Sequence, residues 1–586
     1  MHLRWLDRLQ FRLINIIYFK LGDKLMKKAL FVPVLVLILA LSLIAIPADA
    51  KPSGTVNVQI LAVNDFHGNL LPPSGSSGRV GATQTAGGVE YLATHINNLR
   101  ALNPNTVVVS AGDLIGASPL LSALFHDEPT IEAFNQMGLD FNAVGNHEFD
   151  EGATELLRMQ NGGCHPVDGC QDGDAFAGAN FQFLAANVVR KDNGKTLFPA
   201  YKIRSFDGAK IAFIGMTLEG TPLIVTPSGI SNLNFLDEAD TVNNLVPQLK
   251  AKGIETIVVL IHEGGVQNVG VDPVTINQCN GISGAIVDIV NRMDPEVDVV
   301  VSGHTHQPYN CTINNKLVTS AYSFGRLVTK IDLTIDRTTG EVASMAANNR
   351  IVTRDVALDS GITALITKYN TLSAPFANRV VGRISADILR ATNPAGESAL
   401  GDVIADAQLA ATAPAGLGDA VVAFMNPGGI RADLVYNQIS GGELPGEVTY
   451  SEMFNVQPFG NSMVTMTLTG AQIERLLEEQ LPGCTLATAR ILQVSAGFTY
   501  TYSGTGPACE RVDPATIMLN GVPVNPTASY RVTVNSFLAD GGDSFPILVQ
   551  GINRLGGAVD TDALEAYLTA NAPVSPGPQN RITFIP

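Results

Sequence analysis

The hexapeptide Gly145–Asp150 places four side chains that could do chemistry within five consecutive positions. Asn146 offers a neutral amide oxygen to a metal ion. His147, held by Asp150, could act as a cation or a general acid toward a substrate. A turn in which Asn146 and Asp150 satisfy backbone groups is the simpler alternative. Because short motifs often arise by chance, this one alone leaves both interpretations open.

Ligand-type residues follow four further apolar segments in the same way. A lone histidine at such a place is usually structural, but chance rarely puts metal-binding residue types at five successive strand ends. The residues are Asp65 and His67 after 56–63, Asp113 after 105–111, His262 after 256–261, and His304 and His306 after 297–302.

The elements that must position these residues alternate between strands and helices. The strands are short and apolar, and helical segments are predicted at 89–99, 129–137 and 237–252. Such alternation is typical of an open α/β sheet, whose strands end at the ligand crevice. The glycine-rich, polar stretch 164–194 is predicted to be an insertion loop.

A chain of 586 residues is too long for one core and predicts two large domains. We expect a leader at 1–50, a first domain at 51–350, a helical linker at 351–379 and a second α/β domain at 380–586. In the second domain, loop-like stretches follow apolar strands at 426–431, 457–461 and 535–543. Two of them carry a phenylalanine in a turn, where burial in a core is awkward.

The composition is that of a globular protein, with 46% hydrophobic and 16% charged residues. The formal net charge is −17, and residues 1–50 carry more basic than acidic side chains, so the remainder is more acidic still. Such a chain repels nucleic-acid polymers and acidic membranes in general. An anionic substrate would therefore need local positive charge from metals or a few arginines.

The apolar run Ala29–Ile46 follows Lys27-Lys28 and precedes Ala48-Asp49-Ala50. This order predicts a secretory signal that starts at Met26 and is cleaved after Ala50. We therefore expect an exported protein without stable membrane contact once the signal is removed. An uncleaved anchor is the alternative, because the run approaches the length of a membrane-spanning helix.

All six cysteines follow the apolar run, and an even number in an exported chain indicates three disulfides. Proximity in sequence favours Cys164 with Cys170, Cys279 with Cys311, and Cys484 with Cys509. Six cysteines nevertheless allow fifteen pairings in principle. Binding of zinc by thiolates is the other possibility, although the spacings match no common zinc site.

The motifs together resemble those of the bacterial and animal ecto 5'-nucleotidases. In the first half, the matching motifs are DFHG (65–68), GD (112–113), GNHEFD (145–150), HEGG (262–265) and GHTH (303–306). In the second half they are NPGGIR (426–431), PFGN (458–461) and FLADGGD (537–543). The resemblance implies a four-layer αββα metallophosphoesterase sandwich, joined by the helical linker to an α/β substrate-binding domain.

The resemblance also implies two divalent metal ions, with Asp113 bridging them. One site would use Asp65, His67, Asp113 and His306, and the other Asp113, Asn146, His262 and His304. His147 and Asp150 would form the catalytic pair. Some bacterial members carry glutamine at the place of His306, and an imidazole there favours zinc, manganese, cobalt or iron over magnesium.

In the second domain, the resemblance makes Phe459 and Phe537 the two faces that sandwich a nucleobase. Asp543 would bind the ribose hydroxyls, and Asn426 and Arg431 would lie near the base or phosphate. Arg390 is a further candidate for the phosphate. Stacking on aromatic rings tolerates every base, so broad nucleotide specificity is expected.

The predicted function is removal of the 5'-phosphate from nucleoside monophosphates, with UDP-sugars or dinucleotides as further candidate substrates. The alternatives within the same class are a 2',3'-cyclic nucleotide phosphodiesterase and a thiol esterase of sulfur oxidation. A non-catalytic surface binding protein that kept the fold is the alternative from another class.

Overall fold

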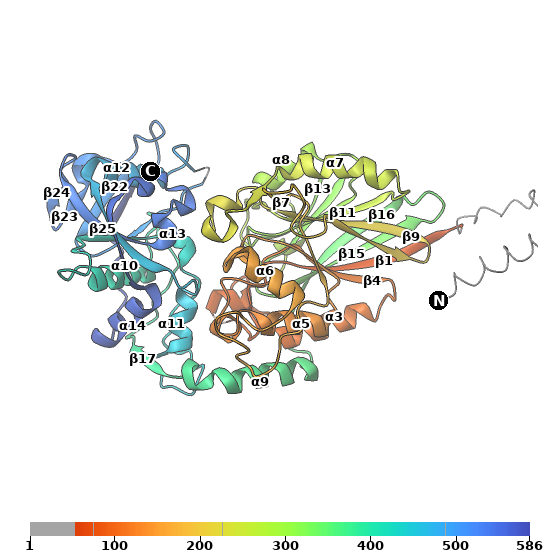
Figure 1. Cartoon of the computed structure of the whole chain (residues 1–586), viewed down its shortest axis with the longest axis horizontal. Coiled ribbons are helices and arrows are strands. Elements are labelled where there is room, and N and C mark those ends of the chain that lie inside the picture. The colour runs from red at the N-terminus through yellow and green to blue at the C-terminus, as the bar shows by residue number, and fades with distance from the viewer. Residues whose placement is uncertain (1–52, 74, 226, 487) are drawn as a thin grey trace, which may run out of the picture. The chain divides into compact units, whose positions relative to one another are not determined.

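The structure, a computed structural model, describes residues 53–586 apart from 74, 226 and 487 (Figure 1). The predicted leader lies outside the described residues. Residues 53–586 form one compact unit. Among the described helices, none combines the length and the apolar character needed to cross a membrane.

Two six-stranded sheets form the centre of the N-terminal domain. The first has the order β16-β15-β1-β4-β5-β6, with bounds β1 (Thr55–Val63), β4 (Thr106–Ser110), β5 (Phe141–Ala143), β6 (Gln182–Leu184), β15 (Leu327–Asp336) and β16 (Val342–Ile351). The second has the order β13-β14-β12-β11-β9-β8, with bounds β8 (Tyr201–Phe206), β9 (Ala209–Thr217), β11 (Thr256–His262), β12 (Val299–Ser302), β13 (Pro308–Ile313) and β14 (Lys316–Ala321).

Apolar residues alternate along these strands and divide the domain into layers. In β11, Val258 and Leu260 pack between the two sheets, whereas Ile257 and Val259 pack on the outer side. The outer cores are covered by α3 (Val89–Arg100), α5 (Glu128–Met137) and α9 (Ser360–Ala377) on the first sheet, and by α7 (Glu238–Lys250) and α8 (Ala285–Arg292) on the second. The predicted αββα sandwich is confirmed, and Figure 1 shows the helices outside the sheets.

Helix α9 lies within the predicted linker but packs as part of the N-terminal domain. Its residues Ile362, Leu365 and Tyr369 belong to the same core as α3 and α5. The chain then enters the C-terminal part through β17 (Val380–Arg383). The exact domain boundaries remain a prediction.

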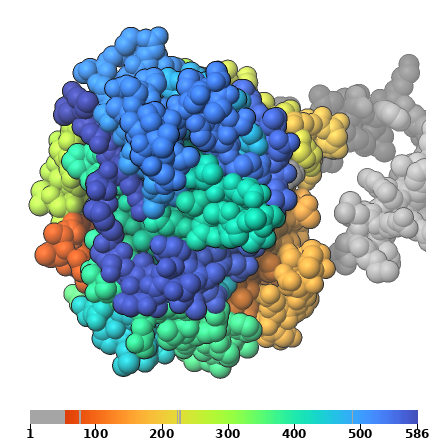
Figure 2. Space-filling view, turned by 90° about the vertical axis from the view of Figure 1, so that its left-hand side faces the viewer, coloured from red at the N-terminus to blue at the C-terminus, as the bar shows by residue number. Residues whose placement is uncertain are grey.

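The C-terminal domain is built on a five-stranded sheet of order β21-β18-β25-β20-β26 and a four-stranded sheet of order β24-β23-β22-β27. The strands are β18 (Val422–Met425), β20 (Ser462–Thr469), β21 (Gln493–Val494), β22 (Phe498–Ser503), β23 (Met518–Leu519), β24 (Val522–Pro523), β25 (Ser529–Asn535), β26 (Ile552–Val559) and β27 (Ile582–Ile585). Helices α10 (Ala399–Thr412) and α14 (Asp560–Ala570) share one apolar core. Helix α12 (Gly470–Glu479) packs into another. Figure 2 shows this domain, cyan to blue, filling most of the face in view.

The prediction of an insertion loop at 164–194 is partly wrong. β6 extends the first sheet beside β5, and β7 (Val188–Arg190) pairs with β10 (Leu233–Phe235). These strands have three residues each, which is too short for a period of two to stand out. The part that precedes β6 is irregular or turn-like, as are the short connections 185–187 and 191–194. The structure contains all three disulfides in the pairing that proximity favoured.

Candidate functional site

Six of the seven predicted metal ligands lie in the loops just after their strands, and His262 is the last residue of β11. Strands β1, β4 and β5 are parallel neighbours in one sheet, and β11 and β12 in the other, so their carboxyl ends meet at one edge of the sandwich. Five of the seven residues have the left-handed backbone that side chains other than glycine rarely adopt: Asp65 (φ 50°), His67 (47°), Asp113 (52°), His304 (69°) and His306 (51°). Such strain is typical of functional sites, where the surrounding structure holds it in place.

Asp65, His67 and His306 form the first group of ligand atoms. The Nε2 atoms of His67 and His306 are 3.1 Å apart, and Nε2 of His306 is 3.3 Å from an oxygen of Asp65. Asp65 and His67 are buried. The sequence prediction that these side chains meet is supported by this geometry.

Asp113, His262 and His304 form the second group. Nε2 of His262 lies 2.9 Å from Oδ2 of Asp113 and 3.1 Å from the amide oxygen of Asn146. The same Asp113 oxygen is 3.7 Å from Nε2 of His67 in the first group. Asp113 therefore stands between the two groups, as a bridging carboxylate must.

The hydrogen bonds of the histidines suit ligation of a cation. Nδ1 of His67 lies 2.9 Å from the carbonyl oxygen of Gly116, and Nδ1 of His262 lies 2.8 Å from that of Ala111. A proton on each Nδ1 leaves a lone pair on Nε2 in the neutral ring. These lone pairs face carboxylate, amide and imidazole acceptors, an arrangement that a positive ion between them satisfies. The donor set therefore fits two divalent cations.

Burial and the neighbouring charges shift the pKa values of the two histidines of the second group in opposite directions. Burial lowers the pKa of His304 to about 3, and the charge of His262 adds to this shift. Burial also acts to lower the pKa of His262, but the carboxylate of Asp113 outweighs it and raises the pKa to about 10. A proton on His262 can thus occupy the place of a cation, and cation binding would displace it.

His147 and Asp150 lie beside these groups on the loop after β5. Nδ1 of His147 is 2.9 Å from Oδ2 of Asp150, and the backbone N–H of Ala117 donates to the same oxygen at 2.9 Å. Burial acts to lower the pKa of His147, but the charges of Asp150 and Asp113 outweigh it, so the pKa lies above its usual value. The arrangement favours a protonated imidazole at this position.

Glu148 holds the two loops together, a role the sequence did not reveal. Its buried carboxylate accepts hydrogen bonds from the backbone N–H groups of Asp113 (2.9 Å), Leu114 (2.9 Å) and Gly145 (2.6 Å). The side chain of Asn142 donates to it at 3.1 Å. The motif contained Glu148, but no spacing rule indicates contacts with residues so far away in the sequence.

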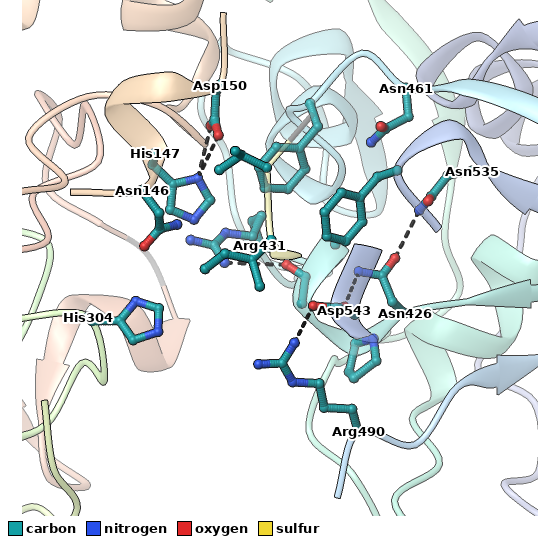
Figure 3. A pocket seen from close by; sticks show the side chains of 17 residues that line it. Asn146, His147, Asp150, His304, Asn426, Arg431, Asn461, Arg490, Asn535 and Asp543 are labelled. Carbon is teal, nitrogen blue, oxygen red and sulfur yellow. Dashed lines mark hydrogen bonds and ion pairs between the residues drawn. The ribbon is translucent and has the colours of Figure 1, made fainter. Parts of the chain in front are cut away.

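A cavity of about 310 Å³ connects this region to the C-terminal domain. Figure 3 shows Asn146, His147, Asp150 and His304 on one side, Asn426, Asn535, Asp543 and Arg490 on the other, and Arg431 between them. Phe459 and Phe537 also line the cavity. The ring of Phe459 stacks with that of His147 at a centroid distance of 5.9 Å, and the guanidinium of Arg431 lies 5.7 Å from the ring centroid of Phe459.

A polar network lies at the end of the cavity formed by the C-terminal domain. Asn426 donates to Asp543 at 2.8 Å, and Asn535 donates to Asn426 at 2.9 Å. Arg490 forms an ion pair with the other oxygen of Asp543 at 2.5 Å. No role was predicted from the sequence for Arg490 or Asn535. Arg490 precedes the short strand β21 and matches none of the motifs, and Asn535 was noted only as the first residue of the stretch 535–543.

Arg390 lies outside this cavity. Its guanidinium donates to the hydroxyl of Ser77 at 3.1 Å, and the side chain lines a separate pocket with Arg79 and Asp433. Burial lowers the pKa of Arg431, and Arg390 is close enough for its charge to lower that pKa further. This geometry gives no direct support to the predicted contact of Arg390 with a phosphate.

Comparison with known proteins identifies the family. Residues 58–308 match the calcineurin-like phosphoesterase model, and residues 380–550 match the model of the 5'-nucleotidase C-terminal domain. The chain belongs to the 5'-nucleotidase family. Its N-terminal domain resembles the calcineurin-like phosphoesterases, a class whose members use a dimetal centre, and the structure holds candidate ligand groups for such a centre. The family resemblance seen in the motifs is confirmed.

Individual relatives of this 5'-nucleotidase family member carry different names. The chain is 33% identical to Endonuclease YhcR of Bacillus subtilis (strain 168) over 544 residues, which cover 91% of this chain and 41% of that protein. It is 32% identical to Cell wall protein Lmo0130 of Listeria monocytogenes over 532 residues, covering 87% and 66% respectively. The chain therefore spans less than two thirds of the length of both relatives.

Among solved structures, the 5'-nucleotidase precursor from Thermus thermophilus is similar with a TM-score of 0.73 and 26% identity. The match covers 90% of this chain and 99% of that chain. The similarity extends over both domains and confirms the two-domain α/β fold.

Proposed function

We propose that this protein is a dimetal phosphohydrolase that removes the 5'-phosphate from nucleoside monophosphates. One observation carries the proposal. A single cavity is lined by the ligand residues Asn146 and His304, by the pair His147 and Asp150, and by the phenylalanines and Asp543 of the other domain. Such a cavity can place a phosphate beside the predicted metal ligands and His147 while it holds a nucleoside against the phenylalanines and Asp543 of the C-terminal domain.

We assign the metal ligands according to the two groups of donor atoms. One ion would be held by Asp65, His67, Asp113 and His306, and the other by Asp113, Asn146, His262 and His304. Two bound divalent ions would supply positive charge for the phosphoryl oxygens and activate a water nucleophile. The four imidazoles favour zinc, manganese, cobalt or iron.

The protein's own side chains would stabilise the phosphoryl group as charge develops on it. His147 keeps one ring proton toward Asp150, which leaves Nε2–H to interact with the phosphoryl group or the leaving 5'-oxygen. Arg431 would contribute a second positive charge from the opposite domain. Both residues line the cavity.

The nucleoside would bind in the C-terminal domain. Phe459 and Phe537 would stack on the base, and Asp543 would accept hydrogen bonds from the ribose hydroxyls. Asn426 and Arg490 hold Asp543 between them, which fixes the orientation of its carboxylate. Because stacking does not distinguish the bases, we propose broad specificity, with UDP-sugars and dinucleotides as further substrates.

We also propose that the protein is exported. Three disulfides favour an oxidising compartment, and one relative carries the name of a cell wall protein. The signal predicted from residues 26–50 agrees with this location.

The test is phosphate release from AMP by the chain from Lys51 onward, first stripped of metal and then supplied with manganese, zinc or cobalt. We expect release that requires metal and collapses in His147→Ala. UDP-glucose, 2',3'-cyclic AMP and single-stranded RNA are assayed in parallel, because one relative is named an endonuclease. Hydrolysis of cyclic AMP or RNA without release from AMP would contradict the proposal. Bound metal with no hydrolysis of any substrate would favour a binding protein.

A further inference from the structure

A second cluster of histidines and carboxylates lies outside the catalytic cavity. Its members are His126, which follows α4 (Leu120–Ala123); Glu151, just before α6 (Gly152–Asn161); and His165 and Asp168, in the loop closed by the disulfide Cys164–Cys170. We call these four residues the peripheral cluster. They come from three separate segments, and none has a role in the proposed reaction.

The side chains of the peripheral cluster converge closely. Nε2 of His126 is 3.0 Å from Oδ2 of Asp168, and Nδ1 of His165 is 3.2 Å from the same oxygen. Nδ1 of His126 is 2.8 Å from Oε2 of Glu151. The two imidazole rings stack with centroids 3.8 Å apart and an angle of 16° between their planes.

Histidine is scarce in this chain, which makes the pairing informative. The sequence contains nine histidines, and five of them lie at the catalytic cavity or its metal groups. Among the described residues only three others remain, and two of these, His126 and His165, stack on each other between carboxylates. The ligand atoms of His126, Glu151 and His165 all lie within 4.8 Å of one another.

The chemistry and exposure of this set suit a transition-metal ion. Two imidazoles and two carboxylates are ligands that zinc binds in tetrahedral sites. On a zinc ion with ligand distances of about 2.0–2.2 Å, neighbouring ligand atoms lie roughly 3.3 Å apart, close to the separations observed here. The histidine side chains are 16% and 14% exposed and the carboxylates 47% and 44%, so an ion can enter from solvent.

We propose that the peripheral cluster is a third divalent-cation site, of the zinc-binding type, distinct from the two predicted catalytic ions. A histidine binds one ion through a single nitrogen. One carboxylate would therefore join His126 and His165 as a ligand, while the other accepts the proton of the second nitrogen of His126. Paired carboxylate and histidine groups of this kind are common around bound zinc and orient the ligand ring.

The site would join the disulfide loop to the catalytic loop. Glu151 directly follows Asp150, whose carboxylate holds His147, and Asp168 belongs to the loop outside it. In Figure 2 the orange to gold part of the chain, which includes these segments, reaches the surface at one edge of the face shown. An ion here would restrain the loop that supports the catalytic pair without contacting a substrate.

The competing explanation is an ion-pair cluster without metal. A protonated His126 can donate to both Glu151 and Asp168, and the hydrogen bond to Glu151 raises the pKa of His126 to about 9, against the effect of burial. Nδ1 of His165 accepts from the backbone N–H of Asp168 at 3.1 Å, a bond that an ion on this nitrogen would replace. Metal counting separates the two explanations.

The experiment measures zinc equivalents per chain by elemental analysis, on protein without a histidine tag, after equilibration with zinc and removal of free metal. We expect three equivalents in the wild type and two in His165→Gln. Asp113→Asn, which disrupts the predicted catalytic centre, should retain the peripheral ion, and adding His165→Gln to it should remove one more equivalent. The matched control His95→Gln alters the remaining described histidine and should leave three equivalents.

A second readout uses cobalt in the Asp113→Asn protein. We expect the visible absorption of a tetrahedral cobalt site, lost when His165→Gln is added. His165 and Asp168 lie in a surface loop, and circular dichroism checks that each variant is folded. Equal zinc equivalents in the wild type and His165→Gln would overturn the proposal, and the cluster would then be an ion-pair network. This result would leave the proposed nucleotidase function untouched.

Discussion

At the scale of single residues, His147 depends on two carboxylates for its proton. Asp150 holds Nδ1 at 2.9 Å, and an oxygen of Asp113 accepts from the backbone N–H of His147 at 2.9 Å. These negative charges raise the pKa of the imidazole and keep it protonated despite its burial. The residue is therefore suited to stabilise negative charge rather than to bind a cation.

We expect His147→Ala to reduce kcat for AMP about 10²- to 10⁴-fold, because general acid catalysis and charge stabilisation are lost together. Metal content, measured by elemental analysis, should stay the same because His147 is not a predicted ligand. His95→Ala, on helix α3 and outside the lining of the cavity, is the matched control. A variant that retains wild-type kcat would contradict the assigned role.

We expect Phe459→Ala and Phe537→Ala each to raise KM for AMP roughly tenfold to a hundredfold, since base stacking contributes about 1–3 kcal/mol. Hydrolysis of para-nitrophenyl phosphate should change little, because this substrate has no nucleobase and still occupies the phosphate end. Equal losses on both substrates would show that the phenylalanines support the fold of the cavity instead of binding a base.

At the scale of elements, Glu148 joins the ends of β4 and β5. Three backbone N–H groups of the two loops and the side chain of Asn142 in β5 donate to its carboxylate. Each charged hydrogen bond of this kind contributes about 1.5–3 kcal/mol, and a buried donor left without a partner carries a penalty. The positions of Asp113 and Asn146 therefore depend on a residue that touches neither ion nor substrate.

We expect Glu148→Ala to destabilise the protein by about 3 kcal/mol and to weaken metal binding, because the donors at Asp113, Leu114 and Gly145 lose their acceptor. Thermal unfolding with and without added zinc measures both effects. Glu263→Gln is a useful comparison, since this carboxylate accepts from the neighbouring Gly264 N–H at 2.8 Å and joins no two strands. Similar metal affinity in Glu148→Ala and wild type would contradict this prediction.

A second feature at this scale is Asp298, which directly precedes β12. Its carboxylate accepts from the backbone N–H of Ile257 at 2.9 Å, and burial raises its pKa to about 7, with Glu341 and Glu296 adding to the shift. Lys250 opposes the shift, and Lys316 also lies near. Because the pKa is higher in the folded than in the unfolded state, Asp298 contributes stability below about pH 4 that is lost as the pH rises through about 7.

We therefore expect Asp298→Asn to gain stability relative to the wild type as the pH increases from about 5 to about 8. A change on the order of 2 kcal/mol follows from the size of the shift, since one pKa unit corresponds to about 1.4 kcal/mol. The midpoint of thermal unfolding, measured at several pH values for both proteins, tests this. If the difference in midpoint between Asp298→Asn and the wild type does not vary with pH, the titration of Asp298 is not the cause.

At the scale of the whole molecule, the cavity requires both domains. The predicted ligands and His147 come from the edge of the sandwich, while Phe459, Phe537 and Asp543 come from the C-terminal domain. Neither set alone can hold a phosphate and a nucleoside together. The ligand groups also place several acceptors within hydrogen-bond distance of one another, so bound cations should stabilise the whole unit.

We expect removal of metal with a chelator to abolish phosphate release and to lower the midpoint of thermal unfolding. At zinc concentrations about 100 times the dissociation constant, one bound ion contributes about 2.7 kcal/mol. In the double variant His262→Gln with His304→Gln, the chelator should lower the midpoint of thermal unfolding much less than in the wild type. A chelated protein with an unchanged midpoint would contradict binding by these ligands.

The sequence by itself determined the kinds of residue at the strand ends, the alternation of strands and helices, and the motifs of both domains. These features are local, since alternation with a period of two fixes which side of a strand faces the core, as for Val258 and Val259 in β11, which pack on opposite sides of the sheet. Disulfides between cysteines close in sequence were predictable for the same reason. Three-residue strands such as β6 were missed, because they are too short to show a period.

Only the tertiary structure decided which distant residues meet. The hydrogen bond of Glu148 with Leu114, the ion pair of Arg490 with Asp543 and the stacking of His126 on His165 join segments that lie far apart in the sequence. No periodicity or turn chemistry encodes such contacts, because they arise from the packing of sheets and loops against one another. The sequence thus identified which residue types could act in catalysis, and the folded structure determined which other residues hold them in position and contact them.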